Sequence, residues 1–374
     1  MFEIFTVGFA CFGALLWWII VLLPWKPTST KEYLESNPRL NSEQISNVTI
    51  LIPARNESAS IERTLQALST QGKNLPIIIV DDQSEDDTSE KAKNFPVTII
   101  SGTTLPTGWS GKLWALEQGL AHIKTSYVLL LDADIELDNG MVATLLQKAE
   151  HEQLAFVSLM AEPNMDSFIE RLLMPAFVFF FKLLYPFKLS NTPQSKIAAA
   201  AGGCILVKRE ALHQIGAFNC LRNALIDDCT LANRVKQAGF LTWTGLSHSV
   251  KSHREYQTLM PIWDMVARTA YTQLNYSIFW LLVCTLLMIS LFWFAPVGSF
   301  LAEEWLGVMI GLFTWLAMLV AYIPTLQFYR RSLLWVIALP FIGFLFLLMT
   351  WTSALKYWRG ERALWKNRRY EISL

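Results

Sequence analysis

The sequence predicts an α/β protein in which helices cover a mostly parallel sheet, with apolar membrane helices at both ends of the chain. Between residues 47 and 245, short apolar runs of strand length alternate with stretches whose apolar residues recur at helical spacing. This alternation is typical of parallel strands joined by right-handed crossover helices. Two of the runs end in paired carboxylates, and long uncharged segments flank the whole stretch.

The composition places the chain between soluble and membrane proteins. Of 374 residues, 53% are hydrophobic and 17% charged, and the formal net charge is zero. A mean hydropathy of +0.32 is too apolar for an ordinary soluble domain, while the charged fraction is too high for an all-membrane transporter. Neutral charge argues against nucleic acid as a partner. The five cysteines show no CxxC spacing, which argues against a zinc site or a disulfide framework.

Residues 1–26 are expected to be an N-terminal transmembrane anchor. Residues 4–25 carry no charge and would make roughly 30 Å of helix. No basic residue precedes the apolar run and no small-residue cleavage site follows it, so a retained anchor is favoured over a secretion signal. Lys26, Lys31 and Arg39 come next, which places the following domain in the cytoplasm. We therefore expect a multi-pass protein of the inner (cytoplasmic) membrane.

The first half of the α/β domain is predicted to contain four buried strands with helices between them. The predicted strands are residues 48–52, 76–80, 97–100 and 127–131. A loop at 53–57 leaves the first strand, and apolar residues mark the helices that follow, at Ile61, Leu65 and Leu68 and at Leu113, Leu116, Leu120 and Ile123. Ser84 and Asp138 are expected to be N-caps of the helices that come after them. These features predict a nucleotide-binding type of domain.

The fourth strand ends in two carboxylates one residue apart, Asp132 and Asp134. Side chains alternate along a strand, so these two project the same way. Paired carboxylates suit a hard divalent cation that also carries phosphate oxygens, and ligands of open α/β sheets bind beyond the carboxyl ends of the strands. The alternative is a helix N-cap pair after a strand.

The second half of the domain contains one unusual segment, residues 168–188. A helix with Val142, Leu145 and Leu146 and a strand at 155–160 precede it. The segment is rich in phenylalanine but too short to span a bilayer. It is either a core helix or a helix lying in the membrane interface, where it could line an entrance for a lipid, and we favour the second interpretation.

Two further features bear on chemistry. Residues 198–203 have very small side chains, which either admit a bound substrate close to the backbone or pack tightly. After a strand at 204–207, Asp227 and Asp228 open a helix that Gly239 ends. Asp228 is either a capping carboxylate or, if it lies in a cleft, a base for an attacking hydroxyl.

Residues 277–355 are expected to contain about three further membrane segments, at 277–295, 305–329 and 333–355. Glu303 and Glu304 place one loop outside, while Arg330 and Arg331 and the basic tail, residues 356–374, belong inside. Three simple crossings would leave the tail outside. Either the segment with Pro340 and Gly343 is re-entrant, or one span is wrong.

Four motifs in this order resemble the family 2 glycosyltransferases with the Rossmann-like GT-A fold, over about residues 47–276. They are Ile52-Pro53-Ala54-Arg55-Asn56-Glu57, Val80-Asp81-Asp82-Gln83-Ser84, Asp132-Ala133-Asp134 and Ile226-Asp227-Asp228. The chain is most similar to the hopene-associated glycosyltransferases, which are related to the ceramide and carotenoid glycosyltransferases. Residues 108–115, 265–274 and 365–370 carry that resemblance.

The resemblance implies a role for each motif. Pro53, Ala54, Arg55 and Glu57, with Asp82, would hold the uridine of a UDP-sugar, and Lys112 would lie near the diphosphate. Asp132 and Asp134 would bind ribose and an Mg²⁺ or Mn²⁺ ion. Asp228 would be the general base, and Asp227 stands where the family more often has glutamate.

The resemblance implies an inverting transfer of sugar to the hydroxyl of a lipid, of the hopanoid or a related isoprenoid type. The Gln/Arg-x-x-Arg-Trp motif of many members is missing, since the region reads Ala267-Arg268-Thr269-Ala270-Tyr271, and its absence argues against a polymer product. The alternatives are transfer to a polyprenyl phosphate and an inactive membrane scaffold with the same fold.

Overall fold

The computed structural model describes residues 2–40, 42–222, 224, 226–301, 305–361, 364–365 and 368–369. The chain forms two compact units, each made of several segments. The first contains Met1–Lys31, Met165–Pro186 and Tyr256–Glu361. The second contains Glu32–Asn164, Phe187–Glu255 and the described part of Arg362–Leu374.

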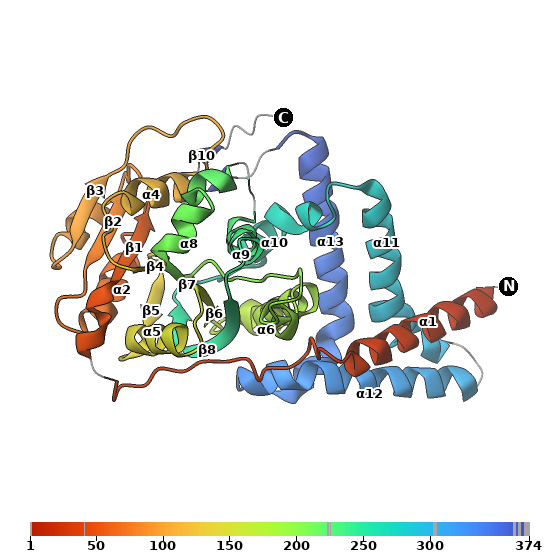
Figure 1. The fold of residues 1–374 in the computed structure, drawn as a ribbon. Coiled ribbons are helices and arrows are strands. Elements are labelled where there is room, and N and C mark those ends of the chain that lie inside the picture. Colours follow the sequence, from red (N-terminus) through yellow and green to blue (C-terminus); the bar gives the residue numbers. More distant parts are fainter. Residues whose placement is uncertain are drawn as a thin grey trace. The chain divides into compact units, whose positions relative to one another are not determined.

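The second unit is built on a mixed sheet in the order β3-β2-β1-β4-β7-β6-β8-β5 (Figure 1). Its strands are β1 Val48–Ala54, β2 Ile77–Asp81, β3 Thr98–Ser101, β4 Tyr127–Leu131, β5 Ile135–Leu137, β6 Phe156–Glu162, β7 Cys204–Lys208 and β8 Thr242–Ser252. The four expected strands form the parallel half, with Ala54 beside Asp81 and Leu51 beside Leu130. Their carboxyl ends therefore share one edge.

The expectation of a mostly parallel sheet needs correction for the other half. β7 runs antiparallel to both β4 and β6, and β5 runs antiparallel to β8. Only β6 and β8 pair in parallel there. The sequence did not predict this because a strand buried on both faces has the same apolar pattern in either pairing. The antiparallel pairing brings Cys204 beside Leu131, so β7 starts where β4 ends.

Two apolar cores cover the two faces of the sheet, as strand alternation requires. The helices of this unit are α2 Ile61–Ser69, α3 Thr88–Ala92, α4 Gly111–Leu120, α5 Met141–His151, α7 Phe187–Ser190, α8 Arg209–Gln214 and α9 Asp227–Gln237, with 3-10 turns η1 Ser42–Asn47 and η2 Ala217–Leu221. α2 and α5 pack with Ile50, Ile52 and Leu129. α4, α8 and α9 pack on the other face with Leu51 and Leu130.

Both predicted N-caps are wrong by two or three residues. α3 begins at Thr88 after Asp87, and Ser84 Oγ instead accepts a hydrogen bond from the backbone N–H of Asn56, at 3.0 Å. α5 follows Gly140, whose φ of 82° is left-handed, while the Asp138 carboxylate pairs with Lys251 at 2.8 Å. In both places a partner distant in the sequence engages the polar side chain.

Residues 32–37 form a strap along β8 that the sequence did not predict. Leu34 N donates to Leu246 O at 3.0 Å, and Tyr33 forms a parallel bridge with Leu246. The Glu35 carboxylate accepts hydrogen bonds from the backbone N–H groups of His248 and Ser249. β8 itself was not predicted from the sequence, because polar residues interrupt its apolar pattern.

The first unit is made of apolar helices. They are α1 Phe2–Leu22, α6 Phe168–Leu184, α10 Leu259–Gln273, α11 Ile278–Ile289, α12 Trp305–Phe328 and α13 Leu339–Trp358, with shorter turns η3 Ser290–Phe294 (a π-helix), η4 Gly298–Leu301 and η5 Leu333–Ala338. α1 packs along α12, where Trp18 Nε1 donates to Phe313 O at 3.2 Å (Figure 1).

Two of these helical segments are long and apolar enough to cross a membrane, Trp305–Phe328 and Leu333–Trp358. The expected span at 277–295 reaches that length only when α11 and η3 are joined to α10, from which they are bent by 119°. In the N-terminal helix, the part whose side chains the structure describes is a shorter apolar stretch, Thr6–Leu22. Glu303 and Glu304, which were used to orient these segments, lie outside the described residues.

The unusual segment at 168–188 forms α6 and belongs to the unit of apolar helices. A capping box of Ser167 and Glu170 starts it. Lys182, 1% exposed, donates to Thr28 O and Ser29 O and to the Thr325 hydroxyl, so it ties α6 to α12 and to the chain that leaves α1.

In the basic tail, Leu364–Trp365 pairs with Arg368–Arg369 as a short antiparallel ladder. The tail residues Lys366, Asn367 and Tyr370 lie outside the described residues.

Candidate functional site

The turn after β4 holds the Asp132-Ala133-Asp134 motif in place through backbone hydrogen bonds. Asp132 N donates to Gly203 O at 3.0 Å, and the Thr64 hydroxyl of α2 donates to Ala133 O at 2.8 Å. His253 N, just after β8, donates to Asp134 O at 2.9 Å. Three elements therefore fix this turn at the edge of the sheet where β1, β2 and β4 end.

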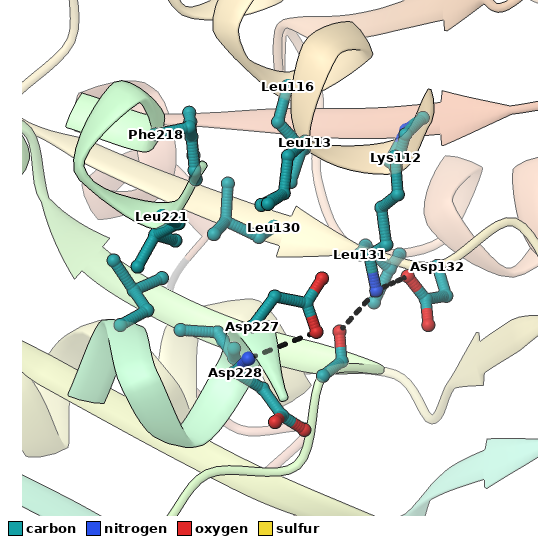
Figure 2. Close-up of a pocket in the computed structure, with 14 residues that line it drawn as sticks. Lys112, Leu113, Leu116, Leu130, Leu131, Asp132, Phe218, Leu221, Asp227 and Asp228 are labelled. Atoms are coloured by element: carbon teal, nitrogen blue, oxygen red, sulfur yellow. Dashed lines mark hydrogen bonds and ion pairs between the residues drawn. The ribbon is translucent and has the colours of Figure 1, made fainter. Parts of the chain in front are cut away.

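Lys112 lies in the first turn of α4, whose N-cap is Ser110. Its Nζ is 2.6 Å from Asp132 Oδ1 and donates to Gly202 O at 3.4 Å, as Figure 2 shows. Burial alone would lower the pKa of Lys112, but Asp132 and Asp227 hold it above its usual range. The lysine is therefore a fixed positive charge beside the motif.

Asp227 and Asp228 form the first turn of α9. Asp228 N donates to Asp227 Oδ1 at 3.1 Å, and Asp228 Oδ1 accepts from Cys229 N at 2.7 Å. Burial and then the neighbouring Asp227 raise the pKa of Asp228 to about 6, against the lowering effects of the Cys229 N–H and of Lys112. A carboxyl group with this pKa is ionised at neutral pH and is still basic enough to accept a proton.

These charged groups share a pocket of about 350 Å³, open solvent at its mouth included. Figure 2 shows Lys112, Asp132, Asp227 and Asp228 gathered together, with an apolar wall beside them. The pocket is lined by Pro53, Lys112, Leu113, Leu116, Leu130, Leu131, Asp132, Gly202, Ile205, Phe218, Leu221, Asp227, Asp228 and Leu231. Charged groups from β4, α4 and α9 thus converge at one end of a mainly apolar cavity.

Gly202 lies between the lysine and the candidate base. A Cβ atom at this position would be 3.3 Å from Lys112 Nζ and 3.4 Å from Asp228 Oδ2. The absence of a side chain therefore keeps open the space between these two groups. The sequence had suggested a close approach to the backbone at 198–203, and the structure places that approach here.

Asp134 does not line this pocket but lies close enough to Asp132 to be affected by it. Burial, then Asp132, raises the pKa of Asp134, and Glu57 adds to the effect, while Arg254 opposes it. Crowded carboxylates favour a bound cation, because a cation would relieve their repulsion. Glu57 therefore lies on the Asp134 side of the site.

The carboxylate pair fits a divalent cation that is completed by substrate. Within the described part of the chain, no three His, Cys, Asp or Glu side chains are grouped as a protein-only metal site requires. Mg²⁺ commonly binds through one or two carboxylates together with substrate phosphates, and Asp132 with Asp134 is such a set. Asp132 would then share its charge between the cation and Lys112.

The loops after β1 and β2 are joined by Arg55. This side chain is 5% exposed, its Nη1 donates to Asp82 O and Gln83 O at 2.6 Å, and its Nη2 pairs with Glu85 at 3.0 Å. Asp82 N donates to Ala54 O at 2.8 Å, and the Asp82 side chain is fully buried. Arg55 therefore connects the two loops.

The structure brings together some of the predicted residues more closely than others. Pro53, Lys112, Asp132, Asp227 and Asp228 line one pocket. Ala54, Arg55 and Asp82 lie at the neighbouring strand ends. Arg268 belongs to α10 in the other unit, so its role stays a prediction.

Thr64, His253 and Gly202 were not predicted as site residues. Only Gly202 had a signal in the sequence, in the run of small residues.

Comparisons with known proteins show what this chain is similar to. Residues 49–216 match the family model described as Glycosyl transferase family 2. The chain is 31% identical over 112 residues to a 4,4'-diaponeurosporenoate glycosyltransferase of Staphylococcus haemolyticus (strain JCSC1435), and 33% identical over 104 residues to one of Staphylococcus aureus (strain bovine RF122 / ET3-1). These matches cover 29% and 27% of this chain and 30% and 28% of the relatives. The chain thus matches less than a third of the length of these relatives.

A solved structure shares the fold at low sequence identity. A mannosyltransferase from Pyrobaculum calidifontis, in complex with GDP-Man and Mn²⁺, matches with a TM-score of 0.58 and 17% identity, over 97% of this chain and 100% of that one. Residues 49–216 therefore resemble a glycosyltransferase family 2 domain, and the chain shares the mixed α/β sheet of the GT-A fold.

Proposed function

We propose that this glycosyltransferase family 2 domain belongs to a membrane-bound inverting enzyme that moves a sugar from a UDP-sugar to the hydroxyl group of a lipid. The observation that carries the proposal is the pocket in which Asp228, with a pKa raised to about 6, meets the Lys112–Asp132 pair. The relatives named as diaponeurosporenoate glycosyltransferases support a lipid acceptor. The acceptor we propose is a hopanoid or a related isoprenoid.

The donor would bind along the ends of β1, β2 and β4. The loop from Pro53 to Glu57, with Asp82, would hold the uridine, and Asp132 would contact ribose. Lys112 would lie against the diphosphate, where its fixed charge stabilises the negative charge that builds on the leaving group. Asp227 keeps the Lys112 pKa high and so supports this role. A bound Mg²⁺ or Mn²⁺, held by Asp132 and Asp134, would supply further Lewis-acid stabilisation of the diphosphate.

Asp228 would accept the proton of the attacking hydroxyl. Its carboxylate is ionised at neutral pH, and its raised pKa makes it a stronger base than an exposed aspartate. The Cys229 N–H that donates to Oδ1 fixes the orientation of the carboxylate. Attack from the side opposite the diphosphate, in one displacement, would invert the anomeric centre.

The apolar helices would hold the domain at the inner face of the cytoplasmic membrane. Two segments, Trp305–Phe328 and Leu333–Trp358, have the length and composition of membrane spans. We propose that α6 lies in the membrane interface, since its sequence is apolar, Phe168 and Leu184 are exposed, and it is too short to span. A lipid acceptor confined to the same surface would react at a high effective concentration.

Mass spectrometry of total lipids tests the proposal. A host that supplies isoprenoid alcohols should accumulate a hexosylated lipid when it expresses the wild-type chain and not when it expresses Asp228→Asn. NMR of the isolated product should show the β-anomer from an α-linked UDP-sugar. Transfer to a polyprenyl phosphate that survives Asp228→Asn would contradict the proposal, since a phosphate acceptor needs no strong base, and a wild-type chain that gives no product would contradict it too.

A further inference from the structure

The loop before α4 presents a fixed aromatic platform next to the site. Trp109 lies three residues before Lys112 and is 4% exposed. Its backbone N–H closes a turn on Pro106 O at 3.2 Å, and its ring packs on Trp114, with centroids 5.1 Å apart. The Trp114 Nε1 in turn donates to the Thr103 hydroxyl at 3.2 Å. The indole of Trp109 is therefore held on several sides.

Arg222, in the loop that leads to the acidic pair, lies over this platform. Its guanidinium carbon is 5.2 Å from the centroid of the Trp109 ring, while the residue as a whole is exposed. Leu221, the residue before it, lines the pocket, and Asp227 follows five residues later. The contact joins the loop that carries Lys112 to the loop that carries the candidate base.

Arg222 has no acidic partner among the residues that the structure describes. Glu117, on the adjacent face of α4, accepts from Phe218 N at 2.9 Å. The sequence places no acid between Arg222 and Asp227, where it reads Asn223-Ala224-Leu225-Ile226.

An arginine held over an aromatic ring is suited to bind an oxyanion. The cation–π contact restricts the side chain and leaves guanidinium N–H groups available to donate. Two parallel N–H donors match the geometry of a carboxylate or a phosphate. An exposed guanidinium that lies over an aromatic ring beside a pocket, with no acidic partner among the described residues, therefore has the properties of a ligand-binding group.

We propose that Arg222, oriented by Trp109, binds an oxyanion of a substrate at the mouth of the pocket. The anion is either the diphosphate of the donor or a carboxylate or phosphate on the acceptor, since both present the same pair of oxygens. The inference rests on the proposed function in that it takes the pocket to be the transfer site. No family motif quoted above includes Arg222, so the assignment comes from the geometry of this chain.

The test compares Arg222→Gln, Arg222→Lys and Lys208→Gln in the full-length protein. Lys208 is the matched control, because its Nζ also lies over an aromatic ring, that of Tyr127, 5.9 Å from the centroid and at the opposite end of β4 from Asp132. Calorimetry measures the Kd of UDP and of inorganic pyrophosphate in the presence of Mn²⁺. Turnover measures kcat and KM for a lipid alcohol and for a lipid alcohol that also carries a carboxylate or phosphate.

Arg222→Gln should weaken one of these interactions about tenfold or more, the range of a charge-assisted hydrogen bond. Arg222→Lys should recover only part of the loss, because it keeps the charge but loses the planar fork. Lys208→Gln should leave every value at the wild-type level. A higher Kd for UDP and pyrophosphate assigns the diphosphate, and an unchanged Kd with a higher KM for the anionic acceptor assigns the acceptor.

The inference is overturned if Arg222→Gln matches wild type in both Kd values and in both KM values. The two proposals fail separately. A wild-type chain that binds pyrophosphate through Arg222 but neither binds UDP nor forms product retains the anion site and loses the proposed function. A wild-type chain that transfers sugar equally well with and without Arg222 retains the function and loses the inference.

Discussion

Burial, and then the neighbouring Asp227, raise the pKa of Asp228, while Lys112 lowers it. If Asp228 is the base, activity requires its ionised form. The rate should therefore rise as the pH increases through about 6 and level off above that value.

Asp227→Asn removes a negative charge that raises the pKa of Asp228, so the acidic limb of the rate profile should move to lower pH. Lys112→Gln removes a positive charge that lowers this pKa, so the limb should move to higher pH, in addition to the loss of leaving-group stabilisation. The measurement is kcat against pH for the three proteins. Shifts in the same direction for both variants would contradict the assignment of Asp228 as the base.

Gly202 gives a second prediction at the residue scale. In Gly202→Ala the new methyl group would lie between Lys112 Nζ and Asp228 Oδ2, so transfer to a lipid should fall about tenfold or more, while hydrolysis of the donor by water should be less affected. Gly203→Ala is the control, because its Cβ would meet the Ile135 side chain at 3.1 Å instead. Equal losses of transfer and hydrolysis in Gly202→Ala would show that the glycine does not admit the acceptor.

The acidic pairs were predicted from their positions at the ends of strands and at the start of a helix, and Lys112 from the family resemblance. The structure places these residues at one edge of the sheet. The sequence could not predict the Trp109–Arg222 contact or the position of Gly202, because these depend on loops that are about 90 to 110 residues apart in the chain. The gap between Lys112 and Asp228 exists only once β7 is paired with β4.

At the scale of elements, the start of α4 positions Lys112. The Ser110 hydroxyl accepts from Leu113 N at 3.2 Å and caps the helix. Ser110→Ala should lower the free energy of unfolding by about 1 kcal/mol and reduce kcat, because the first turn that carries Lys112 would fray. Ser110→Thr keeps a capping hydroxyl and should retain most of both values. Thermal unfolding and turnover check this, and a Ser110→Ala protein with wild-type stability and turnover would contradict it.

The parallel half of the sheet was predictable and the antiparallel half was not. β1, β2, β3 and β4 are short apolar runs separated by helical patterns, which is the arrangement that local sequence can reveal. β8 has eleven residues and includes Ser247, His248 and Lys251, so it lacks a clear period. Its partners are β5, β6 and the strap at residues 32–37, all distant in the sequence.

At the scale of the whole molecule, the apolar helices predict an integral membrane protein. The two segments of 24 and 26 residues should keep the chain in the membrane pellet after extraction with sodium carbonate at high pH, because burial of their apolar surface in lipid does not depend on charge. A peripheral protein held by charge alone would be released. Complete release of the full-length chain would contradict the assignment of these helices as membrane spans.

The distribution of charged residues could predict that the chain has membrane segments, but not where each crossing begins and ends. The uncharged stretch at 277–295 predicts one membrane span, whereas in the structure this region is bent by 119° from α10. The bend depends on the Asn275-Tyr276 pair, whose φ angles of 51° and 54° are left-handed. Hydropathy does not report backbone conformation of this kind, so the number of crossings could not be derived from composition.

Asp228→Asn, compared with wild type on one preparation, tests the central claim most directly. The Kd of UDP with Mn²⁺ and the kcat for lipid glycosylation should be measured together. The account predicts an unchanged Kd and a kcat lower by about 100-fold or more, because the variant keeps the shape of the site and loses its base. A variant that transfers sugar at the wild-type rate would contradict the account.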